Sequence, residues 1–141
     1  MLQARLPETA PEHVAVGKQL AESSCGGCHG VNGISTTTGI PNLAGQRPAY
    51  LYTELKAYQS GGRKNAAMNT VVRFISDDAL VKVAAYYASL DPAQPASGTP
   101  TYLDPVAAGK TAAAACAGCH GETGVSQTPG TPSLAGLAPH A

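Results

Sequence analysis

The chain has 141 residues, which is room for one domain or two small ones. Nine basic and nine acidic residues give a formal charge of zero, and this balance lacks the basic excess that binding to nucleic acid or a membrane surface needs. No apolar run is long enough to cross a bilayer. One Phe, six Tyr and no Trp leave few large side chains, so a domain of this size makes a thin core by itself.

The first predicted helix begins at Pro11, because proline suits the first helical turn and Glu12 favours the positive end of the helix. It runs to about Ser24. Gly17 lies in its middle, where glycine costs about 1 kcal/mol relative to alanine, and this indicates close approach by another backbone. Residues 30–46 carry Gly, Thr and Pro without periodicity and are predicted to form a loop.

Two further helices follow this loop. Pro48 begins one that continues to Ser60, where two glycines end it. Ser76 is the predicted N-cap of the other, which runs to about Leu90. Its apolar face consists of Leu80, Val83, Ala84 and Tyr87. Because no segment has a convincing strand pattern, the predicted class is all-α.

The pentapeptide Cys-x-x-Cys-His occurs twice, at residues 25–29 and 116–120, and it uses every cysteine of the chain. This spacing is the attachment signature of c-type haem. A Cys-x-x-Cys pair can also be a redox dithiol, a disulfide or half of a zinc site, and the two pairs together could form one four-cysteine zinc site. Those alternatives leave the histidine after each pair unexplained, so covalent haem is the favoured interpretation.

The two motifs belong to a repeated unit. With an offset of 91, residues 116–141 match residues 25–50 at fourteen of 26 positions without a gap. The predicted organisation is an N-terminal extension (1–11), a first domain (12–90), a Pro-, Ser- and Gly-rich linker (91–105) and the start of a second domain (106–141). The second copy ends at the equivalent of Tyr50, so we expect this chain to be a piece of a longer protein; a naturally short second unit is the alternative.

The chain resembles the class I cytochromes c, and its duplicated layout is similar to the di-haem cytochromes of the cytochrome c4 type and to the related cytochrome subunit of flavocytochrome c sulfide dehydrogenase. The resemblance implies one complete cytochrome c domain plus the N-terminal part of a second. The matching residues are the two CxxCHG motifs, residues 41–46, Tyr50-Leu51, Gly61-Gly62-Arg63, Met68 and the last helix with Asp78, Ala79, Tyr86 and Tyr87.

This resemblance assigns roles around two covalently bound haem c groups. The thioether bonds would come from Cys25, Cys28, Cys116 and Cys119. His29 and His120 would be the proximal iron ligands, and the carbonyls of Pro41 and Pro132 would accept hydrogen bonds from them. A loop proline with no such role is the alternative for both.

Met68 would be the sixth ligand of the first haem, since a thioether is a soft ligand that raises the reduction potential. Its polar neighbours suit a ligand loop better than a core helix, although filling a gap in the core is the alternative. A second methionine at the same spacing would fall near position 159. His140 aligns with Ala49 at a helix start, which argues against its being a ligand.

Three more side chains and one glycine are given weaker roles. Arg63, Tyr50 and Gln46 could hydrogen-bond a haem propionate, or could be solvated surface residues. Gly17 would pack against Tyr86 or Tyr87 if the first and last helices cross as in the family.

The resemblance implies a periplasmic electron carrier and not an enzyme. Its partners would be a quinol-oxidising complex, a terminal oxidase or a dehydrogenase, with no role for nucleic acid. Residues 1–11 lack the apolar core of an export signal, so the signal is expected to have been removed; a cytosolic protein is the alternative. Two other functions remain open, a haem-relay subunit of a dehydrogenase complex and a haem enzyme or sensor with an open second iron.

Overall fold

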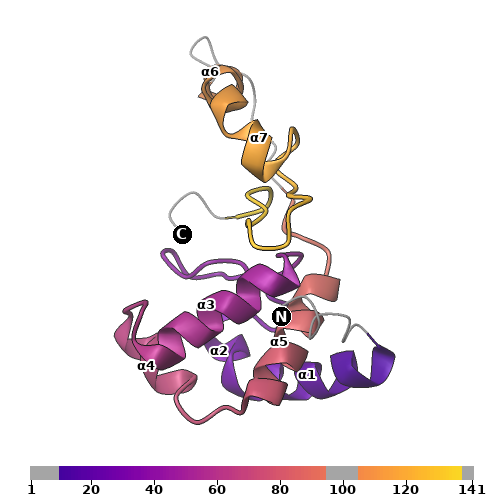
Figure 1. Cartoon of the computed structure of the whole chain (residues 1–141), viewed down its shortest axis with the longest axis vertical. Coiled ribbons are helices and arrows are strands. Elements are labelled where there is room, and N and C mark those ends of the chain that lie inside the picture. Colours follow the sequence, from indigo (N-terminus) through magenta and orange to yellow (C-terminus); the bar gives the residue numbers. More distant parts are fainter. Residues whose placement is uncertain (1–9, 95–104, 138–141) are drawn as a thin grey trace.

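A computed structural model describes residues 10–94 and 105–137, and the described residues contain helices and loops but no strand. The predicted all-α class is confirmed. We call α1–α5 and their loops the first unit, and α6, η2, α7 and the loop to Leu137 the second unit; the second unit stands on one end of the first (Figure 1). The elements are α1 (Pro11–Ser24), α2 (Gly26–His29), α3 (Pro48–Ser60), α4 (Ala66–Val71), α5 (Asp77–Ser89), α6 (Pro105–Ala112), the 3-10 helix η2 (Ala113–Ala115) and α7 (Ala117–His120).

The three long helices lie where the sequence predicted them. Pro11 occupies the first turn of α1, and Gly61 ends α3 in the left-handed conformation with a φ of 84°. The side chain of Ser76 caps α5 by accepting a hydrogen bond of 3.1 Å from the main-chain N–H of Ala79. Residues 30–46 contain no helix, as expected.

Crossing of α1 and α5 organises the first unit, and Gly17 is the point of closest approach. A Cβ on Gly17 would overlap the carbonyl oxygen of Lys82. The prediction of a close backbone contact is therefore confirmed. The three atoms nearest to such a Cβ belong to Lys82 and Val83, and packing of Gly17 against Tyr86 or Tyr87 stays a prediction.

The core of the first unit lies between α1, α3 and α5. Leu80, Val83, Ala84 and Tyr87, the predicted apolar face of α5, are all at most 3% exposed. They pack with Ala21 of α1 and with residues of α3 in one cluster. Burial of this face is the main source of stability for the helices, because propensity alone holds short helices poorly.

The segment around Met68 differs from the sequence-based expectation. A ligand loop was predicted there, but residues 66–71 form the short helix α4. Asn65 caps it, accepting a hydrogen bond of 3.0 Å from the main-chain N–H of Met68. Asparagine favours this N-cap position because its side-chain oxygen satisfies a free amide of the first turn. No residue of α4 is buried, so the expectation that this is not a core helix is correct.

The second unit is more open than the first. No residue of α7 or η2 is buried, and the side chains described in α6 are exposed. α6 begins at Pro105, the last residue of the predicted linker, whereas residues 95–104 lie outside the described part of the chain. Within the described residues, no helix has the length and apolar character needed to cross a membrane.

Candidate haem-attachment sites

The two Cys-x-x-Cys-His segments have the same local structure. In each, the first cysteine ends one helix and the remaining residues form a four-residue helix, α2 or α7. The main-chain N–H of each histidine donates to the carbonyl of the first cysteine at 3.0 Å. A glycine follows each histidine with nearly identical backbone angles, φ 85° and ψ 152° at Gly30 and φ 84° and ψ 152° at Gly121.

The loop after each motif folds in the same way as well. Gly33 accepts hydrogen bonds from the main-chain N–H groups of Leu43 and Ala44 at 2.8 and 3.1 Å. Gly124 accepts the equivalent bonds in the second unit, at 2.7 and 3.1 Å. The repeat that was detected in the sequence is thus a repeat of structure.

These loops bring a proline carbonyl to each histidine. His29 Nδ1 lies 2.8 Å from the carbonyl oxygen of Pro41, and His120 Nδ1 lies 2.8 Å from that of Pro132. A carbonyl accepts only, so Nδ1 carries the proton and Nε2 keeps its lone pair in both rings. That tautomer is the one in which Nε2 can bind a metal, and a carbonyl on the other nitrogen is the usual way of orienting a ligating histidine.

The four cysteines are unpaired, and three of them are exposed. Cys25 is half-buried, and burial raises the pKa of its thiol although a hydrogen bond with Tyr87 acts in the opposite direction. Among residues 10–94 and 105–137, no group of three or more His, Cys, Asp or Glu side chains is arranged to hold a metal ion. The two cysteine pairs therefore do not converge on a shared four-cysteine site, and each pair lies next to its own histidine in the sequence.

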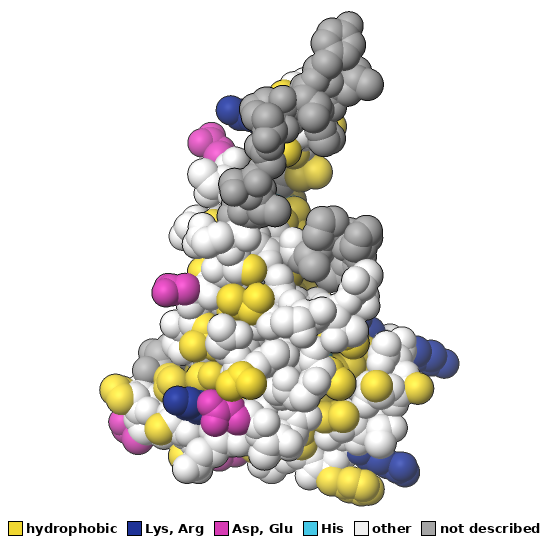
Figure 2. All heavy atoms as spheres, turned by 180° about the vertical axis from the view of Figure 1, so that it is seen from behind, with side chains coloured by type: hydrophobic (Ala, Val, Ile, Leu, Met, Phe, Trp, Pro, Cys, Tyr) yellow, Lys and Arg dark blue, Asp and Glu magenta, His cyan; other side chains and the backbone are white. Residues whose placement is uncertain are grey.

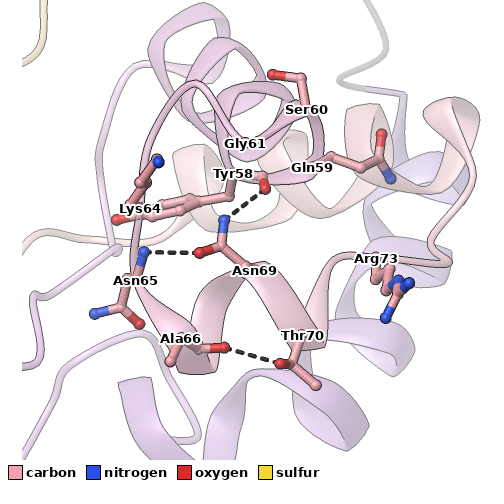
Figure 3. Close-up of a pocket in the computed structure, with 10 residues that line it drawn as sticks. All are labelled: Tyr58, Gln59, Ser60, Gly61, Lys64, Asn65, Ala66, Asn69, Thr70 and Arg73. Carbon is pink, nitrogen blue, oxygen red and sulfur yellow. Dashed lines mark hydrogen bonds between the residues drawn. The ribbon is translucent and has the colours of Figure 1, made fainter.

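Met68 is half-buried on α4, whose position is fixed by Asn69. The Asn69 amide donates to the carbonyls of Tyr58 and Arg63 at 2.7 and 2.9 Å and accepts from the main-chain N–H of Asn65 at 2.8 Å. Figure 3 shows this side chain bridging α4 and the end of α3, beside an open depression of about 590 Å³. Neither motif contributes a residue to the lining of that depression. Iron ligation by Met68 stays a prediction.

Arg63, one of the residues predicted to contact a propionate, already interacts with other side chains of the first unit. The guanidinium of Arg63 lies 2.8 Å from Glu54 and 4.9 Å from the ring of Tyr58. Burial by itself would lower the pKa of Arg63. The hydrogen bonds with Glu54 and Tyr50 act in the opposite direction, and the resulting pKa lies above its ordinary value. The propionate contacts of Arg63 and Tyr50 stay predictions.

Gln46 is 5% exposed and is bonded across to the second unit, so the suggestion that it is a solvated surface residue is wrong. Its Nε2 donates to the carbonyl of Ser133, and its Oε1 accepts from the main-chain N–H groups of Ser133 and Arg47. An amide nitrogen carries two N–H donors, so a propionate contact of Gln46 stays a prediction.

Arg47 is a residue that sequence reasoning missed. Its Nε is buried without a hydrogen-bond partner, in a side chain that comes directly after the loop holding Pro41. A buried guanidinium N–H without an acceptor is costly, and a carboxylate is the acceptor that a guanidinium binds best. The chain therefore fits a group that carries a carboxylate at this place, as the two propionates of a haem do. The only signal in the sequence was a basic residue six positions after Pro41.

Comparisons with known proteins agree with this geometry. Residues 14–91 match the family model described as Cytochrome c. The cytochrome c4 of Pseudomonas aeruginosa is 35% identical over 132 residues, which cover 86% of this chain and 64% of that protein. The thiosulfate dehydrogenase electron acceptor of Thiomonas intermedia is 32% identical over 130 residues, 81% of this chain and 57% of that protein. The chain thus spans less than two thirds of the length of these relatives.

Among solved structures, reduced recombinant cytochrome c4 from Pseudomonas stutzeri superposes with a TM-score of 0.71 at 31% identity, covering 88% of this chain and 73% of that one. The match extends over both units, which confirms the resemblance inferred from the residues. The family model covers more than half of the chain, and the likeness to cytochrome c4 continues into the second motif. This chain belongs to the cytochrome c family, whose cofactor is covalently bound haem c.

Proposed function

We propose that this chain is part of a periplasmic di-haem electron-transfer protein. The observation that carries the proposal is the pair of structurally equivalent motifs, each with a proline carbonyl on Nδ1 of its histidine at 2.8 Å. When bound, haem iron supplies reversible one-electron oxidation and reduction. The domains would be residues 12–90 and, incompletely, 106–141, joined by the linker 91–105.

The chain's own residues would act as follows. Cys25 and Cys28 would hold the first group through thioether bonds, and Cys116 and Cys119 the second. His29 and His120 would bind iron through Nε2, with Pro41 and Pro132 fixing the rings. Met68 would close the sixth position of the first iron, which favours the reduced state and excludes substrates. Arg47, with its unpartnered Nε, would neutralise a propionate, with Arg63 and Tyr50 nearer the surface.

An absorption spectrum of the holoprotein in both redox states tests the proposal. We expect the far-red charge-transfer band of Met-to-ferric-iron ligation in the wild type and its loss in Met68→Ala. The Met68→Ala protein should then take up CO at the first site, whereas the wild type should resist it there. The matched control is Thr70→Ala, which shortens another side chain of α4 and should leave the band unchanged.

Two results would contradict the proposal. The first is a wild-type first site that binds CO readily. The second is a far-red band that persists without Met68, which would assign the sixth position to another residue.

A second role within the same class has support in one relative. The Thiomonas intermedia protein is named as an electron acceptor of thiosulfate dehydrogenase, and it aligns with 81% of this chain. We therefore propose a dehydrogenase as the electron donor in preference to a quinol-oxidising complex, and a terminal oxidase as one possible acceptor. Figure 2 shows dark blue and magenta side chains scattered over this face, in one place next to each other, without a large patch of one sign. Together with the formal charge of zero, this face favours neither sign of partner. Retention of a dehydrogenase subunit on the immobilised holoprotein tests the choice of donor.

A further inference from the structure

Among the described residues, three hydrogen bonds join the two units, and Gln46 makes two of them. Its Nε2 donates to the carbonyl oxygen of Ser133 at 2.8 Å, and the main-chain N–H of Ser133 donates to its Oε1 at 2.7 Å. One side-chain amide thus satisfies both main-chain groups of a single residue. Gln46 and Ser133 are each 5% exposed, so water cannot replace these bonds cheaply. The third bond runs from Asn42 Nδ2 to the carbonyl of Gly136 at 2.9 Å.

This contact is one-sided although the two loops are copies. With the offset of 91, Asn42 corresponds to Ser133 and Gln46 to Leu137. The side chains of Asn42 and Ser133 make equivalent hydrogen bonds within their own loops. Asn42 accepts from the main-chain N–H of Ser35 at 2.7 Å, and Ser133 accepts from that of Ser126 at 3.1 Å. Within the part of the chain that the structure describes, only the first unit contributes side-chain donors to the other unit. It supplies the side chains of the contact, and the second unit supplies main-chain groups.

The contact lies directly beside both histidine-orienting prolines. Ser133 follows Pro132, whose carbonyl holds His120, and Asn42 follows Pro41, whose carbonyl holds His29. The two loops also share Pro92, since a Cβ on Gly45 would lie 2.9 Å from Pro92 Cβ and one on Gly136 3.1 Å from the same atom. The peptide between Pro132 and Ser133, whose carbonyl side bonds His120, is therefore held by hydrogen bonds with Gln46 of the first unit.

We propose that Gln46 is a positioning residue for the second haem site, acting from the first unit through Ser133 and Pro132 on His120. The inference rests on the proposed di-haem function. Fixing the 132–133 peptide fixes the carbonyl that orients His120, and such bonds to a ligating histidine tune the potential of its metal. His120 has little other support, because none of the residues of α7 is buried. A change at position 46 should act more strongly on the distant site than on the site of its own unit.

The test compares Gln46→Met with Gln59→Met in the holoprotein. Both changes remove a glutamine that bridges main-chain groups and keep a side chain of similar length. Gln59 bonds the carbonyls of Val72 and Ile75, at 2.9 and 2.7 Å, entirely within the first unit. The readouts are the midpoint potential of each site, resolved by redox-coupled NMR, and the hydrogen exchange of the Ser133 amide.

In Gln46→Met we expect a shift of the second site's potential and exchange of the Ser133 amide faster by about tenfold or more, because a buried donor has lost its acceptor. Gln59→Met should leave both quantities at their wild-type values. Gln46→Glu keeps the acceptor for Ser133 and loses the donor, so its Ser133 amide should exchange at an intermediate rate. This second variant also tests the inference if Gln46→Met fails to fold.

An unchanged second potential in Gln46→Met, or a shift confined to the first site, would overturn the inference. Equal effects of the Gln46 and Gln59 substitutions on Ser133 exchange would do the same, because they would indicate general destabilisation. Failure of the proposed function gives a different result, since the wild-type protein would then lack two reversible one-electron transitions. With both transitions intact in all variants, the outcome concerns Gln46 alone.

Discussion

The two haem-attachment segments have nearly the same internal geometry but very different surroundings. Their turns, their glycine angles and their histidine-to-proline distances agree closely. His29, however, is 6% exposed, whereas His120 is only partly buried. The local sequence is thus sufficient to form the loop, because identical glycines and prolines direct the backbone in both copies. Burial of the histidine depends on helices that come from elsewhere in the chain.

Substitution of the glycine after each histidine should have the largest effect, and it tests whether the two loops are equivalent. Gly30 and Gly121 have positive φ, and a Cβ on either would overlap a carbonyl oxygen, that of Ile34 or that of Val125. Substitution by alanine should cost about 2 kcal/mol or more in each case, from the left-handed conformation and the overlap together. Hydrogen exchange of the Leu43 and Leu134 amides measures the loss in each loop.

Similar acceleration of Leu43 exchange in Gly30→Ala and of Leu134 exchange in Gly121→Ala would support two equivalent loops. Gly39→Ala is the control at a glycine with positive φ but nothing within 4 Å, and it should cost only the conformational part. A loss in one copy alone would show that the local geometry depends on its surroundings.

Substitution of a second pair of glycines should change the stability of the two units in opposite directions. Gly17 and Gly109 occupy matching places in α1 and α6, but only Gly17 has a neighbour, the carbonyl of Lys82. Gly17→Ala should destabilise the first unit by about 1–3 kcal/mol, because the crossing helices must move apart. Gly109→Ala should stabilise α6 by up to about 1 kcal/mol, since alanine is the better helix former and meets no obstacle.

Chemical denaturation of the holoprotein, followed by far-UV circular dichroism, measures both changes. The expected result is a lower midpoint for Gly17→Ala and an equal or higher one for Gly109→Ala. A lower midpoint for both would mean that α6 has a packing partner among the residues that the structure does not describe.

The same contrast explains how much the sequence could predict. The ends of α1, α3 and α5 follow from Pro11, Gly61 and Ser76, whose effects are local. The proline carbonyls were assigned through the family resemblance, and the described distances agree with it. α4 was missed because its six residues have no apolar periodicity, and its N-cap is recognisable only once Asn65 is seen to accept from Met68.

Long-range contacts were the part that could not be predicted. Gly17 predicted a close approach between two backbones, but it could not identify Lys82 as the neighbour. The register of two crossing helices depends on the packing of their whole contact faces. Gln46 gave no sign of its partner for the same reason. The family resemblance suggested a haem contact for Gln46, whereas its side chain bonds a residue 87 positions away.

The smallest expected difference between the units is a pH dependence that only the first carries. Tyr87 is 2% exposed and packs on Gly33 together with Ala44, whereas the three atoms nearest to a Cβ on the equivalent Gly124 all belong to Ala135, the counterpart of Ala44. Burial raises the pKa of Tyr87 above its ordinary value of about 10. The folded protein then keeps a proton that the unfolded chain has lost. The free energy of unfolding must therefore fall as pH rises above about 10, by at most about 1.4 kcal/mol per pH unit for one such group.

Denaturant unfolding between pH 8 and 11 measures this slope, and Tyr87→Phe should reduce it. Burial also raises the pKa of Tyr86, so Tyr86→Phe and the double variant belong in the same series. An unaltered slope in the double variant would assign the alkaline instability to another group. A reduced slope would locate it in the packing of α5 against the first haem-attachment loop, the contact for which the described second unit has no counterpart, because Ala135 and not a tyrosine lies over Gly124.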